Sequence, residues 1–70
     1  MTIVETLQDE LRTLEGVLKV RQDCTVKLAE RPWTIVNAKL YDLSCAIERI
    51  CQDDVNRKRG ELIRAVSAQH

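Results

Sequence analysis

The sequence predicts an all-α fold, an antiparallel two-helix hairpin that resembles a coiled coil. Two stretches carry apolar residues at alternating spacings of three and four, which is the repeat of helices that pack side by side. The single proline, Pro32, lies between them. A chain of 70 residues makes one small domain, 1–70, and such a domain usually needs a disulfide, a metal or a partner to complete its core.

The first helix is expected over about residues 2–29. Thr2 and Glu5 fit a capping box, in which the Thr2 hydroxyl accepts from the Glu5 amide and the Glu5 side chain reaches back to Thr2. Arg21 and Thr25 interrupt the apolar repeat near its end. The repeat before that interruption predicts the seam that packs against the second helix: Val4, Leu7, Leu11, Leu14 and Leu18.

The corner is expected at residues 30–32, because proline disfavours helical backbone at the residue before it and suits the first turn of a new helix. Thr34 and Asn37 are alternative caps, so the second helix can begin anywhere from Pro32 to Ala38. Trp33 stands beside this corner. We expect it to plug the base of the hairpin; an exposed Trp33 would instead be a partner-binding anchor.

The second helix is expected over about residues 33–59, with the alternative that it runs to 68. Its predicted seam is Trp33, Val36, Leu40, Leu43, Ile47 and Ile50. After residue 50 the apolar stripe shifts by one position to Cys51, Val55, Leu62 and Val66. Gly60 follows three basic residues and favours a helix end. If the helix continues, residues 61–68 should extend beyond the first helix.

The composition excludes several classes of function. Lys+Arg and Asp+Glu both number 11, and zero net charge argues against general binding to polyanions. Trp33 and Tyr41 are the only aromatic residues, too few for a base-stacking platform. No apolar run approaches the roughly 18 residues of a membrane span, and four acidic residues among the first fifteen do not fit a signal peptide. We therefore expect a cytoplasmic protein without membrane contact.

No residues are predicted to be catalytic or to bind a cofactor or metal. Zinc sites use closely spaced cysteine pairs, whereas Cys24, Cys45 and Cys51 are separated by 20 and 5 residues. They are expected to be small buried side chains in a reducing compartment. His70 is terminal, where nothing holds a general base in place. Two helices also form no pocket, so we expect a protein that is not an enzyme.

The surplus of apolar residues predicts association. A lone seam barely offsets the conformational entropy lost on folding, so the flanking stripes should pack either in a homo-oligomeric four-helix bundle or against another protein. Helix-in-groove binding would use anchors spaced three, four and seven residues apart. The residues predicted to face the partner are Val17, Val20, Val55, Leu62 and Val66.

The alternative function is a homodimeric four-helix-bundle regulator that binds RNA or DNA. A local basic patch can grip nucleic acid despite zero net charge, although flanking acidic residues weaken its field. The residues that would form this patch are Arg57, Lys58, Arg59 and Arg64.

In size and layout the chain resembles the small helical-hairpin co-chaperones of bacterial type III secretion systems and, more loosely, the first two helices of flagellar export chaperones. The resemblance covers nearly the whole chain and rests on two seams, Val4-Leu7-Leu11-Leu14-Leu18 and Val36-Leu40-Leu43-Ile47-Ile50. It implies a tetratricopeptide-type chaperone as partner and a needle subunit kept from polymerising early. Such a role needs no catalytic residue.

Overall fold

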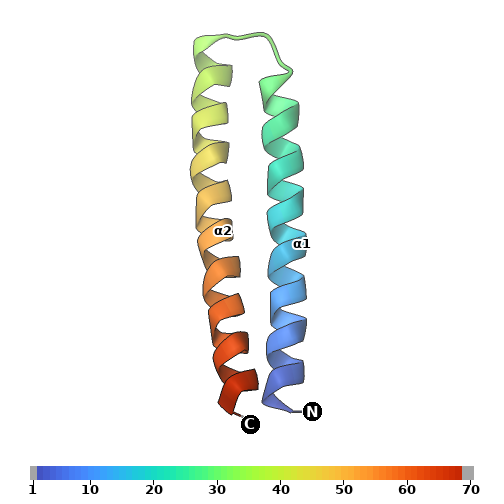
Figure 1. The fold of residues 1–70 in the computed structure, drawn as a ribbon. Coiled ribbons are helices and arrows are strands. Elements are labelled where there is room, and N and C mark those ends of the chain that lie inside the picture. Colours follow the sequence, from blue (N-terminus) through green and yellow to red (C-terminus); the bar gives the residue numbers. More distant parts are fainter. Residues whose placement is uncertain (1, 69–70) are drawn as a thin grey trace.

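The computed structural model describes residues 2–68, which form two helices, α1 (Ile3–Ala29) and α2 (Ile35–Ala68), joined by residues 30–34. The helices run antiparallel and pack along their length, with both chain ends at the end of the hairpin away from the corner (Figure 1). The Cα atoms extend over 54 × 15 × 12 Å. The predicted all-α hairpin is confirmed.

The first helix begins where the sequence predicts. Thr2 has extended backbone and caps α1, its Oγ1 accepting a hydrogen bond from the Glu5 amide at 3.2 Å. Glu5 in the first turn and Lys27 in the last turn also complement the helix dipole. These local signals place the helix within one residue of its expected start and at its expected end.

The corner is longer than predicted and leaves Trp33 outside the core. Thr34 caps α2, which begins at Ile35: the Thr34 Oγ1 accepts from the Asn37 amide at 3.1 Å, while Asn37 Nδ2 donates to the Pro32 carbonyl at 2.7 Å. Trp33 therefore lies in the connecting segment, where it is 67% exposed. It contacts Tyr41 edge to face, with ring centroids 5.8 Å apart. The expectation that Trp33 plugs the hairpin is wrong.

Two contacts set the register of the helices. Thr25 and Ser44 share a hydrogen bond of 2.7 Å, and Lys58 Nζ lies 2.6 Å from Glu10 Oε2. This register places Cys24 level with Cys45. The longer helix α2 consequently extends past α1 at the corner end, whereas its last residues lie beside the start of α1 (Figure 1). The predicted overhang of residues 61–68 is wrong.

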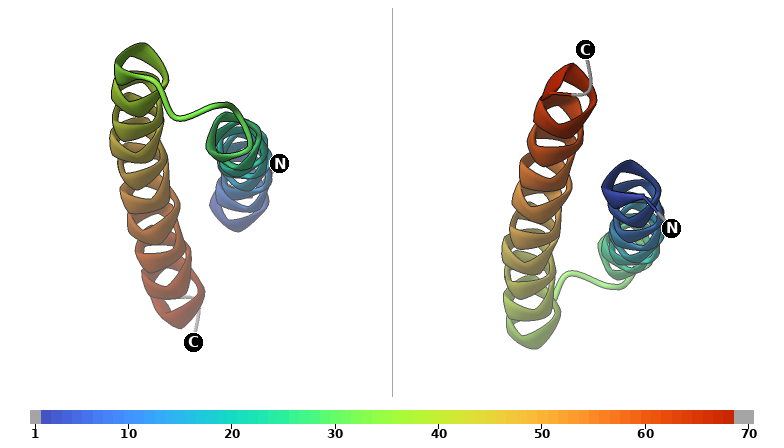
Figure 2. Two further views of the ribbon diagram at one scale, coloured as in Figure 1. Left: turned by 90° about the horizontal axis from the view of Figure 1, so that it is seen from above. Right: turned by 90° about the horizontal axis from the view of Figure 1, so that it is seen from below.

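The seam of α2 differs from the one predicted. Val55 is completely buried and Ser44 is nearly so, and six half-buried residues continue the same spacing of three and four: Tyr41, Glu48, Cys51, Lys58, Leu62 and Ala65. The predicted seam faces outward instead. Val36, Leu43 and Ile50 are each more than half exposed. Figure 2, seen along the hairpin, shows α2 inclined to α1.

A comparison of the two possible rotations of α2 explains this outcome. Packing the Leu43–Ile50 side inward along the whole helix would place Arg57 and Glu61 against the leucines of α1. Removing an unpaired charge from water costs several kcal/mol. The observed rotation brings Lys58 into the seam as well, but with Glu10 and Glu61 as its partners. The observed rotation also places the polar pair Thr25 and Ser44 together.

The second helix passes through Gly60 without interruption and ends at Ala68, which is the longer of the two predicted alternatives. Neither glycine has a positive φ angle. A Cβ added at Gly60 would lie 3.7 Å from Arg64 Nη1, which is an ordinary contact, and one added at Gly16 would meet nothing within 4 Å. The glycines are thus tolerated inside helices rather than required by the backbone.

Candidate protein-interaction face

The outward stripe of α2 is an unpartnered apolar feature of the described residues. It repeats every three or four residues over four turns, as an interhelical seam does, but nothing covers it. Ile50 is 61% exposed, and Ile47 is half-buried at the inner edge of the stripe. Its members are Val36, Leu40, Leu43, Ile47 and Ile50.

Exposed apolar residues of α1 lie on the same side of the hairpin. Lys58 Nζ bonds both Glu10 of α1 and Glu61 of α2, so these two carboxylates mark one side of the seam. Residues seven apart share a row along a coiled-coil helix. The row of Glu10 continues to Val17 and Cys24, and the row of Glu61 leads back to Ile47 and Leu40. These residues of the two helices therefore lie on the same side of the seam.

We call this surface the apolar face. It covers the half of the hairpin nearer the corner, and both helices contribute to it. Its residues are Val17, Val20 and Cys24 of α1 and Val36, Leu40, Leu43, Ile47 and Ile50 of α2. Gln22 lies on the other side of the seam, since it occupies the row of Glu15, about 140° around α1 from Glu10.

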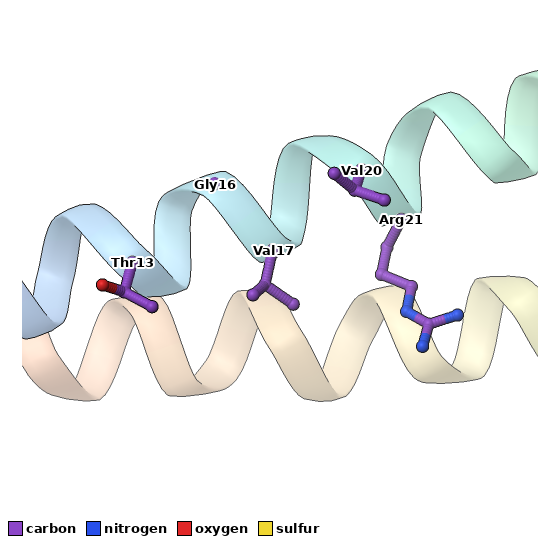
Figure 3. Close-up of a pocket in the computed structure, with 5 residues that line it drawn as sticks. All are labelled: Thr13, Gly16, Val17, Val20 and Arg21. Atoms are coloured by element: carbon purple, nitrogen blue, oxygen red, sulfur yellow. The ribbon is translucent and has the colours of Figure 1, made fainter.

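An open hollow of about 490 Å³ lies at the α1 edge of the apolar face. It is lined by Thr13, Gly16, Val17, Val20 and Arg21. Figure 3 shows their side chains following one another along α1, with none at Gly16. The missing side chain lowers the surface between Thr13 and Val20, so an apolar side chain of another helix can enter there. The hollow holds no group suited to acid–base chemistry.

The five predicted partner-facing residues separate into three groups. Val17 and Val20 are exposed and lie on the apolar face. Val66 is exposed near the end of α2, in the row of Arg59 on the other side of the seam. Val55 and Leu62 belong to the seam itself, Val55 completely buried and Leu62 half-buried. Their placement on a partner face is therefore wrong, because they fill the space opposite the leucines of α1.

In the half of the hairpin away from the corner, charged residues occupy the rows that hold the apolar face near the corner. Lys58 lies in the seam with its side chain only 17% exposed, and it bonds Glu10 at 2.6 Å and Glu61 at 3.0 Å. These hydrogen bonds raise the pKa of Lys58 above its ordinary 10.5, the bond to Glu10 contributing most. The bond to Lys58 in turn lowers the pKa of Glu61. Both groups remain charged over the neutral range.

The basic cluster proposed for nucleic acid is largely paired with carboxylates of the same chain. Arg57 pairs with Asp54 at 3.2 Å, and Arg59 pairs across the seam with Glu15 at 3.3 Å. Lys58 lies between two glutamates. Arg64 alone of the four forms no ion pair among residues 2–68. Phosphate binding would have to break these pairs, so the arrangement does not favour nucleic acid as the ligand.

The cysteines are more accessible than predicted. Cys24 is exposed on the apolar face, and Cys45 and Cys51 are half-buried. Cys45 forms a side-chain hydrogen bond with Tyr41, which raises the pKa of that phenol. Residues 2–68 contain no group of three or more metal-ligating side chains, and His70 lies outside the described residues. Over the same residues, neither helix is long and apolar enough to cross a membrane.

No protein-family model, curated protein or solved structure matches the chain. The site therefore has to be interpreted from its own geometry. Sequence periodicity finds every member of the α2 stripe but assigns the stripe to the wrong neighbour. The missed signal is the polar interruption of the first seam at Arg21 and Thr25, which calls for polar residues such as Ser44 opposite it.

Proposed function

We propose that the chain is a non-catalytic protein-interaction module that binds other helices through the apolar face. The single observation that supports this most strongly is the exposed α2 stripe, whose spacing is that of a packed seam. Contiguous apolar patches rimmed by polar residues are typical of protein-binding surfaces.

The energetics of the apolar face favour a helical partner. Leu43, Ile47 and Ile50 follow the spacing by which one helix anchors in a groove formed by others. Burying one such side chain contributes about 1.5–3 kcal/mol, so several together can exceed the cost of association. The hollow at Gly16 adds a place for one side chain of the partner.

A narrower proposal comes from the resemblance. We propose that the chain acts in the cytoplasm as a type III secretion co-chaperone, with the apolar face bound to a tetratricopeptide chaperone that also holds a needle subunit. The antiparallel hairpin and the uncovered α2 stripe support this role. The predicted consequence is that co-expression with the hairpin keeps the chaperone and needle subunit soluble, whereas the Val20→Glu variant does not.

Site-specific photocrosslinking in cells tests the general proposal. A photoreactive amino acid at position 43 or 50 should give adducts of increased mass, because these positions lie on the apolar face. The same amino acid at Gln22, which is exposed on the other side of the seam in the corner half, is the matched control and should give few. The absence of adducts at 43 and 50, or equal yields at Gln22, would reject the apolar face as a protein-binding surface.

A further inference from the structure

The exposed area of the chain exceeds that of a compact monomer. A folded monomer of 8.1 kDa exposes about 4,500 Å², whereas this hairpin exposes 5313 Å². The surplus of about 800 Å² equals the area that one partner contributes to a standard protein–protein interface. A single additional interface of ordinary size would therefore bring the chain to the burial typical of its mass.

The closed hairpin also has a small core. Leu18 and Val55 are the only apolar side chains among the described residues that are buried. A two-helix seam with so little buried apolar surface barely offsets the conformational entropy lost on folding. Covering the apolar face would add a second seam comparable to the first.

The charges beside the apolar face restrict how it can be covered. The α2 row that contains Leu43 and Ile50 continues, seven residues at a time, to Arg57 and Arg64. The α2 row of Ile47 continues to Asp54 and Glu61, and Glu10 of α1 lies on the same side, so this end of the hairpin carries charges of both signs. A covering surface must therefore be apolar near the corner and carry charges of both signs at the other end. The same face of another hairpin of this sequence has that pattern.

We propose that the apolar face is covered by a second copy of this chain, related by a two-fold axis parallel to the length of the hairpin. This inference rests on the proposed function, since it names the partner of the same surface. The symmetry places α1 of each copy antiparallel to α2 of the other, in the register that already exists within one chain. Apolar halves then meet, and the charged halves of the two copies meet at the other end.

The alternative two-fold axis, perpendicular to the hairpin, fits less well. With full overlap it would lay the charged half of one copy on the apolar half of the other, removing charged side chains such as Arg64 from water against apolar ones. The parallel arrangement instead yields a four-helix bundle with both corners at one end.

Sedimentation equilibrium over a concentration series tests the proposal. The wild-type chain should be a dimer, Leu43→Glu should raise the dimer dissociation constant about 100-fold or more, because the change occurs twice per interface, and Gln22→Glu should leave it within about threefold. A helical wild-type monomer at every concentration would overturn the proposal, and so would equal effects of the two substitutions. The wild-type result decides the question even if Leu43→Glu fails to fold.

The orientation is tested by the distance between nitroxide labels at Trp33→Cys, in a chain whose three native cysteines are replaced by alanine. Corners at one end predict a separation well under half of the 54 Å length of the hairpin. A separation near that length would overturn the parallel arrangement. Crosslinks at position 43 to other proteins, with a monomeric wild type, would overturn this inference and leave the proposed function standing. No crosslinks and a monomer would reject both.

Discussion

Thr25 and Ser44 form a buried hydrogen bond between α1 and α2, with their hydroxyl oxygens 2.7 Å apart. Thr25 Oγ1 also donates to the Arg21 carbonyl at 3.0 Å. A hydroxyl has one proton, so Ser44 must be the donor to Thr25. The bond ties one level of α1 to one level of α2, and a slip of either helix would leave both hydroxyls buried without this partner.

A double-mutant cycle should measure this coupling. Thr25→Val should lower the free energy of unfolding by about 1–2 kcal/mol, because it leaves the Ser44 hydroxyl without an acceptor, and Ser44→Ala should cost about 1 kcal/mol or less. The loss of unfolding free energy in the double variant should be about 1 kcal/mol smaller than the sum of the two single losses. Urea denaturation followed by circular dichroism measures all four proteins.

The control for this cycle is Thr13→Val. Thr13 donates to the Asp9 carbonyl at 3.1 Å, as Thr25 donates to Arg21, but it is exposed and has no partner on α2. It should change stability by less than about 0.5 kcal/mol. Strict additivity of Thr25→Val and Ser44→Ala would contradict the interhelical bond.

Replacing either glycine with alanine should stabilise the hairpin. Gly16 and Gly60 have ordinary helical backbone and room for a Cβ, so each substitution should gain the helix-propensity difference of about 1 kcal/mol. For a domain of this size, that gain raises the thermal midpoint by about 4–8 °C. Thermal melts should show this for Gly60→Ala in particular. A lower midpoint for Gly60→Ala would show that α2 does not continue through this position.

The Lys58 cluster predicts how stability depends on pH. Bonds to Glu10 and Glu61 raise the pKa of Lys58, so its contribution is complete below pH 10.5 and is lost as the pH rises through the raised value. The bond to Lys58 lowers the pKa of Glu61, so that contribution is complete above pH 4.5 and is lost as the pH falls through the lowered value. The urea midpoint should therefore be flat between these limits.

Lys58→Met should reduce both the loss of stability at acid pH and the loss at alkaline pH, because it removes the group common to both hydrogen bonds. At pH 7 it should lower stability, because it leaves Glu10 and Glu61 without their common partner, and the partial exposure of both carboxylates limits the loss. Arg57→Met is the control, as its pair with Asp54 lies on the surface. An unchanged acid decline in Lys58→Met would show that other carboxylates account for the pH dependence.

Glutamate substitutions should separate the seam from the apolar face. Val20→Glu replaces a residue that is 61% exposed and should keep the helical circular dichroism signal of the isolated hairpin at a concentration below that of self-association. Leu62→Glu inserts a charge into the seam and should cost about 2–4 kcal/mol, enough to lose most helicity in so small a domain. The opposite ranking would place Leu62 on the surface.

Local features of the fold could be predicted from the sequence because they depend on neighbouring residues. The capping of α1 by Thr2, the alternative cap Thr34 and the leucine seam of α1 all follow from spacing alone. The connecting segment was harder, because Pro32 is compatible both with a helix start and with a position just before one.

The face of α2 could not be predicted from periodicity, because α2 carries two apolar stripes. One runs from Val36 to Ile50 and the other from Cys51 onward, and each meets the coiled-coil spacing over its own half. Which stripe packs against α1 depends on the whole length of α2, because turning the Val36–Ile50 stripe inward would also bury Arg57 and Glu61. The spacing therefore predicts the α2 stripe as a set of residues but places it in the seam, whereas Val17 and Val20 of α1 are predicted to face a partner. Val55 is predicted outside the seam because periodicity cannot tell the two stripes of α2 apart.

The central claim is that Val55, and not Ile50, packs against the leucines of α1. In a chain whose native cysteines are replaced by alanine, air oxidation of the Leu14→Cys/Val55→Cys variant tests it most directly. We predict rapid closure of a disulfide within one chain, detected as loss of both thiols at monomer mass, and little closure for Leu14→Cys/Ile50→Cys. Efficient closure of the second pair and not the first would contradict the account, because it would turn the apolar face of α2 inward.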